Sequence, residues 1–231
     1  MGNPQQDAQQ AVLDACHQLL ERGLLFGTGG NVSVRIASDA TDIDTLAITP
    51  TSRDYRSLTR DDICVVDFER RPRAGSPKFS METPAHIGVY QNRPDVNAVV
   101  HTHQPFASVF TLTGQSIPAL FDEQVLHLGG RVELIDYAIS GSDEMTDKIV
   151  AALGNRCNAY LLRNHGALVM GTSLEKAMLN AEVLEKVARV YHYALSTGRP
   201  VTALPATSEA VFTRILHEAQ DRVSAPKPQP R

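Results

Sequence analysis

The sequence has 231 residues and a mass of 25.2 kDa, with 42% hydrophobic and 21% charged residues. These fractions of hydrophobic and charged residues are typical of one globular domain with its own core, and they exclude a disordered chain, a coiled coil and a collagen-like repeat. Lysine and arginine number 22 against 26 acidic residues, a net charge of −4 without a basic block, which argues against a nucleic-acid-binding protein.

The three cysteines are widely spaced and form neither a disulfide framework nor a CxxC zinc motif. No run of about 18 apolar residues is present, so we expect no membrane span. The first ten residues are polar and lack the apolar core of a secretory signal. These features together predict a cytoplasmic protein.

The first half of the chain alternates helical and extended patterns. Apolar residues at helical spacing predict a helix over 5–22, with Gly23 as its stop, and residues 32–36 alternate between apolar and polar as in a half-buried strand. Between them lies the glycine-rich segment 27–31. Further along, we predict strands at 46–49, 63–66 and 98–103 and helices at 83–92 and 104–114.

The second half repeats this alternation. Thr172 and Glu175 have the spacing of a capping box before a long helix to about residue 196, and Ser142 is placed to cap a helix that ends at Gly154. Apolar runs predict strands at 132–135, 159–162 and 167–170. We therefore predict a single α/β layered domain over 1–223, followed by a proline-rich, disordered tail over 224–231.

Three histidines have a spacing that suits a metal ion. His101 and His103 end an apolar strand and, being two residues apart, point to the same face. His165 lies in a turn between two apolar strands and is the best candidate for a third ligand, and Glu82 is a plausible acidic partner. A His-x-His pair alone is more often packed or exposed. The other five histidines, including His86, are interpreted as structural or surface residues.

Two turns are rich in groups that bind anions. Gly29, Gly30 and Asn31 would bring backbone N–H groups together, and residues 49–52 form a turn with several hydroxyl groups. Each of these alone is typical of an ordinary turn.

Together, five segments resemble the class II aldolase/adducin family, over about residues 8–195. They occur in the family's order and spacing: Gly30 to Arg35, Ile48 to Ser52, Ser80-Met81-Glu82, His101-Thr102-His103 and Asn164-His165-Gly166. The resemblance implies a central, mainly antiparallel sheet flanked by helices. It also implies a homotetramer with active sites between subunits.

The resemblance assigns roles to individual residues. It makes His101, His103 and His165 the ligands of one divalent ion, most commonly Zn²⁺, with Mn²⁺, Co²⁺ and Fe²⁺ as alternatives. Glu82 corresponds to the acidic residue that completes the metal site and acts as acid/base. The substrate-binding positions are Gly30, Asn31, Thr51, Ser52 and Ser80.

The sequence departs from the sugar-phosphate aldolases at three places. Met81 replaces a serine, Ser52 replaces a glycine, and the tyrosines used as proton donors are missing. Asp122 follows the segment where one such tyrosine is expected, so it is either a replacement acid/base or a helix cap or ion-pair partner.

The leading hypothesis is a metal-dependent lyase that cleaves a C–C bond of a small hydroxy-carbonyl substrate, a sugar or sugar phosphate, by retro-aldol chemistry through an enediolate on the metal. A decarboxylase or dehydratase would use the same site. A non-catalytic scaffold of the adducin kind is a third alternative, which the intact histidine set disfavours.

Overall fold

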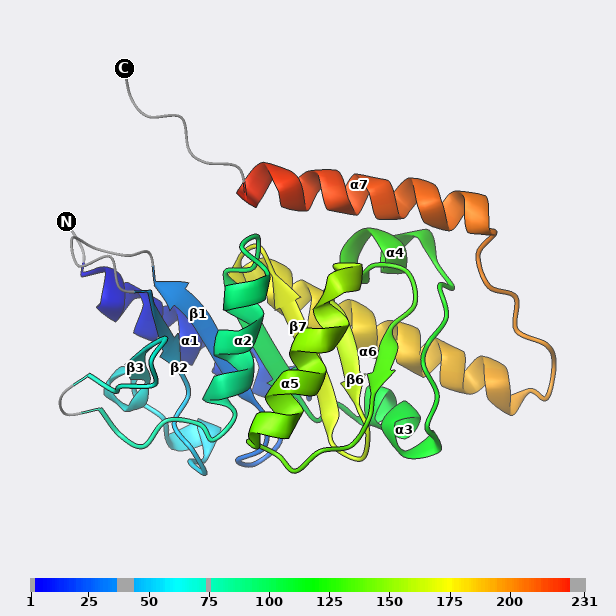
Figure 1. Cartoon of the computed structure of the whole chain (residues 1–231). Helices are drawn as coiled ribbons and strands as arrows, with labels where there is room; N and C mark the ends of the chain where they lie inside the picture. Colours follow the sequence, from blue (N-terminus) through cyan, green and yellow to red (C-terminus); the bar gives the residue numbers. More distant parts are fainter. Residues whose placement is uncertain (1–2, 37–43, 74–75, 225–231) are drawn as a thin grey trace, which may run out of the picture.

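The computed structural model describes residues 3–36, 44–73 and 76–224. Its centre is one seven-stranded sheet in the order β3-β2-β1-β4-β7-β6-β5 (Figure 1). All described neighbours pair antiparallel except β5 and β6, so the predicted mainly antiparallel sheet is confirmed. The strands are β1 (Asn31–Ile36), β2 (Thr45–Ile48), β3 (Cys64–Asp67), β4 (Ala98–Thr102), β5 (Glu133–Ile135), β6 (Ala159–Leu162) and β7 (Gly166–Gly171).

Helices cover both faces of the sheet, as Figure 1 shows with α2 and α5 in front of it and α1 and α6 behind. The strand period of two divides the core accordingly: on β4, Ala98 and Val100 pack towards α1 and α6, whereas Val99 packs towards α2 and α5. The helices of the two layers are α1 (Pro4–Glu21), α3 (Pro105–Thr113) and α6 (Leu174–Ser196), and α2 (Thr83–Asn92) and α5 (Asp143–Ala152).

The structure confirms one of the two predicted helix N-caps and shifts the other. The Ser142 side chain accepts a hydrogen bond from the Met145 amide, as predicted. At α6, however, the cap is Ser173, which accepts from the amide of Lys176. The predicted cap at Thr172 is therefore wrong by one residue: serine and threonine are both good N-cap residues, and the glutamate three residues after Thr172 favoured the wrong one.

Two helices were not predicted, α4 (Asp122–Leu128) and α7 (Ala206–Ser224). The second runs beside α4 at the outside of the molecule (Figure 1) and buries only Leu216 and Gln220. Its apolar residues Val211, Ile215 and Leu216 recur at helical spacing, so the sequence carries the signal for this helix and the prediction omits it. The predicted tail over 224–231 lies outside the described residues apart from Ser224, which ends α7.

Three short 3-10 helices complete the described part of the chain: Tyr55–Ser57, Arg60–Asp62 and Leu153–Asn155. None of the described helices is long and apolar enough to cross a membrane.

Candidate metal centre

The three histidines come from adjacent elements in the middle of the sheet. His101 lies on β4, His103 follows the end of that strand, and His165 occupies the turn that joins β6 to β7. Because β4 pairs with β7, that turn is beside the end of β4. Glu82 enters from the neighbouring layer as the residue immediately before α2.

The ring nitrogens of these histidines converge. His101 Nε2 lies 3.0 Å from His103 Nε2 and 3.2 Å from His165 Nε2. Two ligands of one ion, each about 2.1 Å from it, are about 3.0–3.4 Å apart at angles between tetrahedral and octahedral values. The spacing thus fits a shared divalent ion, as the His-x-His pattern and the isolated turn histidine predict.

The tautomer of His101 also suits metal binding. Its Nδ1 lies 2.9 Å from the carbonyl oxygen of Ala167, and a carbonyl can only accept, so Nδ1 carries the proton and Nε2 keeps its lone pair. Burial, followed by the neighbouring His101 and His165 rings, lowers the pKa of His103 to about 4, and burial also lowers the pKa of His101. Rings that stay neutral are available to a cation.

Glycine and a left-handed turn residue make this convergence possible. A Cβ at Gly166 would lie 2.4 Å from the Thr102 carbonyl oxygen and 2.7 Å from His103 Cδ2, so no larger residue fits between the two strands there. The preceding Asn164 adopts φ 53°, a left-handed conformation that asparagine tolerates better than most residues. The Asn-His-Gly sequence is therefore what turns His165 towards β4.

Glu82 faces the histidine cluster and is held there. Its Oε2 lies 3.3 Å from His101 Nε2 and its Oε1 lies 3.2 Å from His165 Nε2, while Asn31 Nδ2 donates to Oε2 at 2.7 Å. Burial by itself would raise the pKa of this carboxyl, but His101, His165 and the Asn31 amide outweigh that effect and hold it well below its usual range. Glu82 is therefore an ionised, buried carboxylate beside three imidazoles.

A cleft of about 180 Å³ opens next to this cluster. The structure brings all the predicted substrate-binding positions to its walls: Gly30, Asn31, Thr51, Ser52 and Ser80. No lysine or arginine is among the described lining residues. Ser52 adopts φ 54°, so it keeps the left-handed conformation that a glycine would take at this turn.

The side chain of Asn31 is already engaged inside the protein. Its Nδ2 donates to Glu82 and its Oδ1 faces His86, and the residue is only 4% exposed. Asn31 thus contributes to the cleft through Glu82 more directly than through a side-chain contact with a substrate.

Asp122 is placed differently. It is the first residue of α4, it is exposed, and it is not among the residues that line this chain's cleft. A carboxylate in the first turn of a helix interacts favourably with the helix dipole, which accounts for its position without catalysis. Within one chain, therefore, the structure does not bring Asp122 to the metal centre.

Sequence reasoning missed two residues near the site. Ser140, in the loop before α5, lines the cleft with its Oγ 3.3 Å from His165 Nε2. No pattern in the sequence distinguishes it from an ordinary loop serine. His86 is fully buried and hydrogen-bonded to Asn31, so it also belongs to the surroundings of the site.

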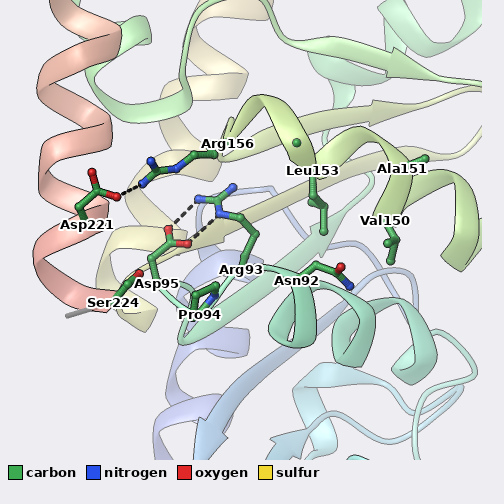
Figure 2. Close-up of a pocket in the computed structure, with 11 residues that line it drawn as sticks. Asn92, Arg93, Pro94, Asp95, Val150, Ala151, Leu153, Arg156, Asp221 and Ser224 are labelled. Carbon is green, nitrogen blue, oxygen red and sulfur yellow. Dashed lines mark hydrogen bonds and ion pairs between the residues drawn. The ribbon is translucent and has the colours of Figure 1, made fainter. Parts of the chain in front are cut away.

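A second, larger hollow of about 520 Å³ lies between the ends of α2, α5 and α7 (Figure 2). Its charged groups are paired with one another. Arg93 Nη2 lies 2.7 Å from Asp95 Oδ2, and Arg156 Nη2 lies 2.7 Å from Asp221 Oδ1. These side chains have their partners within the protein, so the cleft at the histidines is the better candidate for a functional site.

Comparison with known proteins agrees with this assignment. Residues 10–192 match the model of the family described as Class II Aldolase and Adducin N-terminal domain. L-fuculose phosphate aldolase from Escherichia coli (strain K12) is 35% identical over 193 residues, covering 84% of this chain and 86% of that protein. The 5-methylthioribulose-1-phosphate/5-deoxyribulose-1-phosphate aldolase from Rhodospirillum rubrum is 34% identical over 223 residues, 95% of this chain and 96% of that protein.

The fold is shared as well. A solved structure of L-fuculose 1-phosphate aldolase superimposes with a TM-score of 0.80 at 28% identity, covering 90% of this chain and 95% of the other. The relatives are aldolases rather than scaffold proteins, so this chain is an enzyme of the aldolase-type lyase class. Family match, sequence identity and fold together show that the chain belongs to the class II aldolase and adducin N-terminal domain family.

Proposed function

We propose that the protein is a divalent-metal-dependent lyase that cleaves a C–C bond of a small sugar phosphate by a retro-aldol reaction. The observation that supports this best is the convergence of three imidazole nitrogens, with the Glu82 carboxylate 3.2 to 3.3 Å from two of them. His101, His103 and His165 would hold the ion, with Glu82 as a fourth, exchangeable ligand.

A divalent ion at this place supplies a Lewis acid that stabilises the negative charge developing as the C–C bond breaks. The protein must also move protons, because a retro-aldol cleavage removes one from a substrate hydroxyl and returns one to carbon. Glu82 is the only acidic side chain among the described lining residues of the cleft. We assign it both steps, first as base and then as acid.

The far wall of the cleft suits an anionic group. Hydroxyl groups at Thr51, Ser52 and Ser80, together with the glycine turn at Gly30, offer hydrogen-bond donors without a lysine or arginine. The named substrates of the two curated relatives are sugar phosphates. We therefore place the substrate phosphate against this wall.

The proposal extends to the cofactor, the assembly and the cellular setting. We expect Zn²⁺ in the site, a donor set of histidine nitrogens and one carboxylate being typical of catalytic zinc. A homotetramer with sites between subunits is proposed from the family resemblance. In such an assembly, the exposed Asp122 takes part in proton transfer only by entering the cleft of a second subunit. Three free, buried cysteines support a reducing cytoplasm.

The function is tested with a panel of substrates at fixed zinc concentration. L-Fuculose 1-phosphate and 5-deoxyribulose 1-phosphate should each be tried, and cleavage between C3 and C4 should release dihydroxyacetone phosphate and an aldehyde. The competing reactions are tested with hydroxy and keto acids of similar size. Release of CO₂ or water from these acids, with no aldehyde from any sugar phosphate, would contradict the retro-aldol assignment and favour a decarboxylase or dehydratase.

A further inference from the structure

A continuous chain of buried hydrogen bonds leads from Glu82 into the protein interior. Asn31 Nδ2 lies 2.7 Å from Glu82 Oε2, and His86 Nε2 lies 2.5 Å from Asn31 Oδ1. Ser33 Oγ then lies 2.7 Å from both His86 Nδ1 and the Tyr90 hydroxyl. All five side chains are buried.

The chain exists because a helix and a strand are in register. Glu82, His86 and Tyr90 are four residues apart along α2 and its start, a rise of about 6 Å per step. Asn31 and Ser33 are two residues apart on β1, a rise of about 6.6 Å per step. The two spacings nearly match, so the polar side chains of the helix and the strand alternate along the chain of hydrogen bonds.

The direction of every proton in this chain follows from its end. Asn31 Nδ2 donates to Glu82 Oε2, which leaves the Asn31 oxygen to face His86. That oxygen only accepts, so the proton of His86 is on Nε2. Burial lowers the pKa of His86 to about 3, so the ring is neutral and Nδ1 accepts from Ser33, which in turn accepts from Tyr90.

The ordinary explanation of His86 is a buried histidine whose hydrogen bonds are satisfied. The hydrogen bond from His86 to the Asn31 side chain gives this histidine a further role. An asparagine amide can rotate by half a turn, and only one orientation presents N–H to the carboxylate. The opposite orientation would place the Asn31 oxygen against Glu82 Oε2, with no proton between these two oxygens. The group that selects between these orientations is the Nε2–H of His86.

We propose that His86 is a positioning residue, which fixes the Asn31 amide so that it donates to Glu82 and aims the carboxylate at the reacting groups. Ser33 donates to Nδ1 of His86 and so keeps the proton of the ring on Nε2. The inference rests on the acid/base role proposed for Glu82. Groups that hold such a carboxylate typically contribute about 10–100-fold to activity.

The tautomer is the first test. Nitrogen-15 NMR of the zinc-loaded protein distinguishes a proton on Nε2 from one on Nδ1 and from a charged ring. We expect His86 to be neutral with the proton on Nε2. A proton on Nδ1, or a charged ring, would overturn the proposal whether or not any variant folds.

A pair of substitutions provides the second test. In His86→Gln the terminal amide lies near the original Nε2 and can still donate to Asn31, whereas in His86→Asn it lies near Nδ1 and reaches only Ser33. We expect H86Q to keep most of the wild-type kcat and H86N to lose about 10–100-fold in kcat. KM and bound zinc should stay nearly constant, because neither the histidine ligands nor the phosphate wall is altered.

The control removes a different buried hydrogen-bonding group, a hydroxyl that lies away from the site. Tyr160 donates to Asn155 Oδ1 at 2.6 Å and is fully buried, so Tyr160→Phe should lower the melting temperature without lowering kcat. If kcat in H86Q and H86N fell equally, or followed the melting temperature, His86 would be merely structural.

Failure of this inference is distinct from failure of the proposed function. If Glu82→Gln retained normal turnover while His86 had the expected tautomer, the acid/base assignment would be wrong although the hydrogen-bond chain exists. If Glu82→Gln were inactive and H86N fully active, the function would stand and the positioning role would not.

Discussion

Two of the hollows in the described part of the molecule differ in where their charged or ionisable side chains find their partners. In the larger hollow, Arg93 and Arg156 are each paired with a carboxylate of the protein. In the smaller cleft, three imidazole nitrogens point at one another and at Glu82. Such a cluster directs several nitrogen and oxygen donors to one point, which suits a divalent cation.

Size alone therefore does not identify the functional site. The larger hollow has about 520 Å³ against about 180 Å³ for the cleft. Buried groups that satisfy one another stabilise a fold, whereas groups that converge without a donor–acceptor match are arranged for a ligand.

The largest effect is expected from removing a histidine of the cluster. In His165→Ala the ion loses one of three nitrogen ligands, so bound metal should fall well below one per chain. The lost stabilisation of several kcal/mol corresponds to about 10³-fold or more in kcat/KM. Metal analysis and steady-state kinetics check both. The control is His17→Ala on α1, and equal losses in the two variants would contradict the assignment.

Glu82→Gln should separate proton transfer from metal binding. The amide is nearly isosteric and leaves the three histidines intact, so the ion should remain bound. Because the amide does not titrate, kcat should fall by about 10² or more, the usual scale for a lost acid/base. A variant with near-normal kcat would remove Glu82 from the proton-transfer steps.

In the larger hollow, the expected effect is on stability alone. Asp95→Ala leaves the guanidinium of Arg93 buried without its carboxylate, which costs about 3–5 kcal/mol in the free energy of unfolding. Asp221→Ala, which breaks the more exposed pair with Arg156, should cost at most about 1 kcal/mol. Urea denaturation measures both. A loss of kcat in folded Asp95→Ala protein would mean that this hollow also serves the reaction.

The smallest effect is expected at the turn that holds Ser52. The left-handed conformation of Ser52 costs about 1–2 kcal/mol, which Ser52→Gly removes. Glycine also gives the unfolded chain more freedom, which opposes this gain, so the free energy of unfolding should change by at most about 1 kcal/mol. Because the Ser52 hydroxyl is one of the proposed donors to the phosphate, the same change should weaken inhibition by inorganic phosphate. Stronger inhibition would show instead that the Ser52 side chain crowds the phosphate.

A contrasting change at Gly30 sharpens this comparison. Gly30 has φ 83°, and a Cβ there would lie 2.5 Å from the His101 carbonyl oxygen. Gly30→Ala must therefore shift β4 and should lower both stability and metal affinity, which thermal unfolding and metal titration measure. Equal tolerance of Gly30→Ala and Ser52→Gly would contradict the account of the cleft wall.

The sequence predicts the metal half of the site well, because local rules place it. Alternation in β4 puts His101 and His103 on one face, and the Asn-His-Gly turn needs a glycine for close approach to the neighbouring strand. The pairing of β4 with β7, which brings His165 to them, follows from no local pattern, and the sequence indicates His165 only as a histidine in a turn between two apolar strands.

The rest of the site depends on contacts between elements that a single sequence does not reveal. The link between Asn31 and Glu82 spans 51 positions in the chain, and Ser140 reaches the cleft only through the path of its loop. The four-residue spacing of Glu82, His86 and Tyr90 was visible, but it indicates a polar chain only once β1 is known to face α2. The helix α7 is different, because its apolar residues recur at helical spacing and the sequence alone is enough to predict it.

The lyase activity, as we propose it, depends on one divalent ion held by the three histidines. The direct test is to strip the purified protein with a chelator and titrate Zn²⁺ back while measuring bound metal and aldehyde release from a sugar phosphate that the untreated enzyme cleaves. Activity should return in proportion to bound zinc and saturate at one ion per chain, and His165→Ala should recover neither. Full aldehyde release from metal-free protein would contradict the proposal.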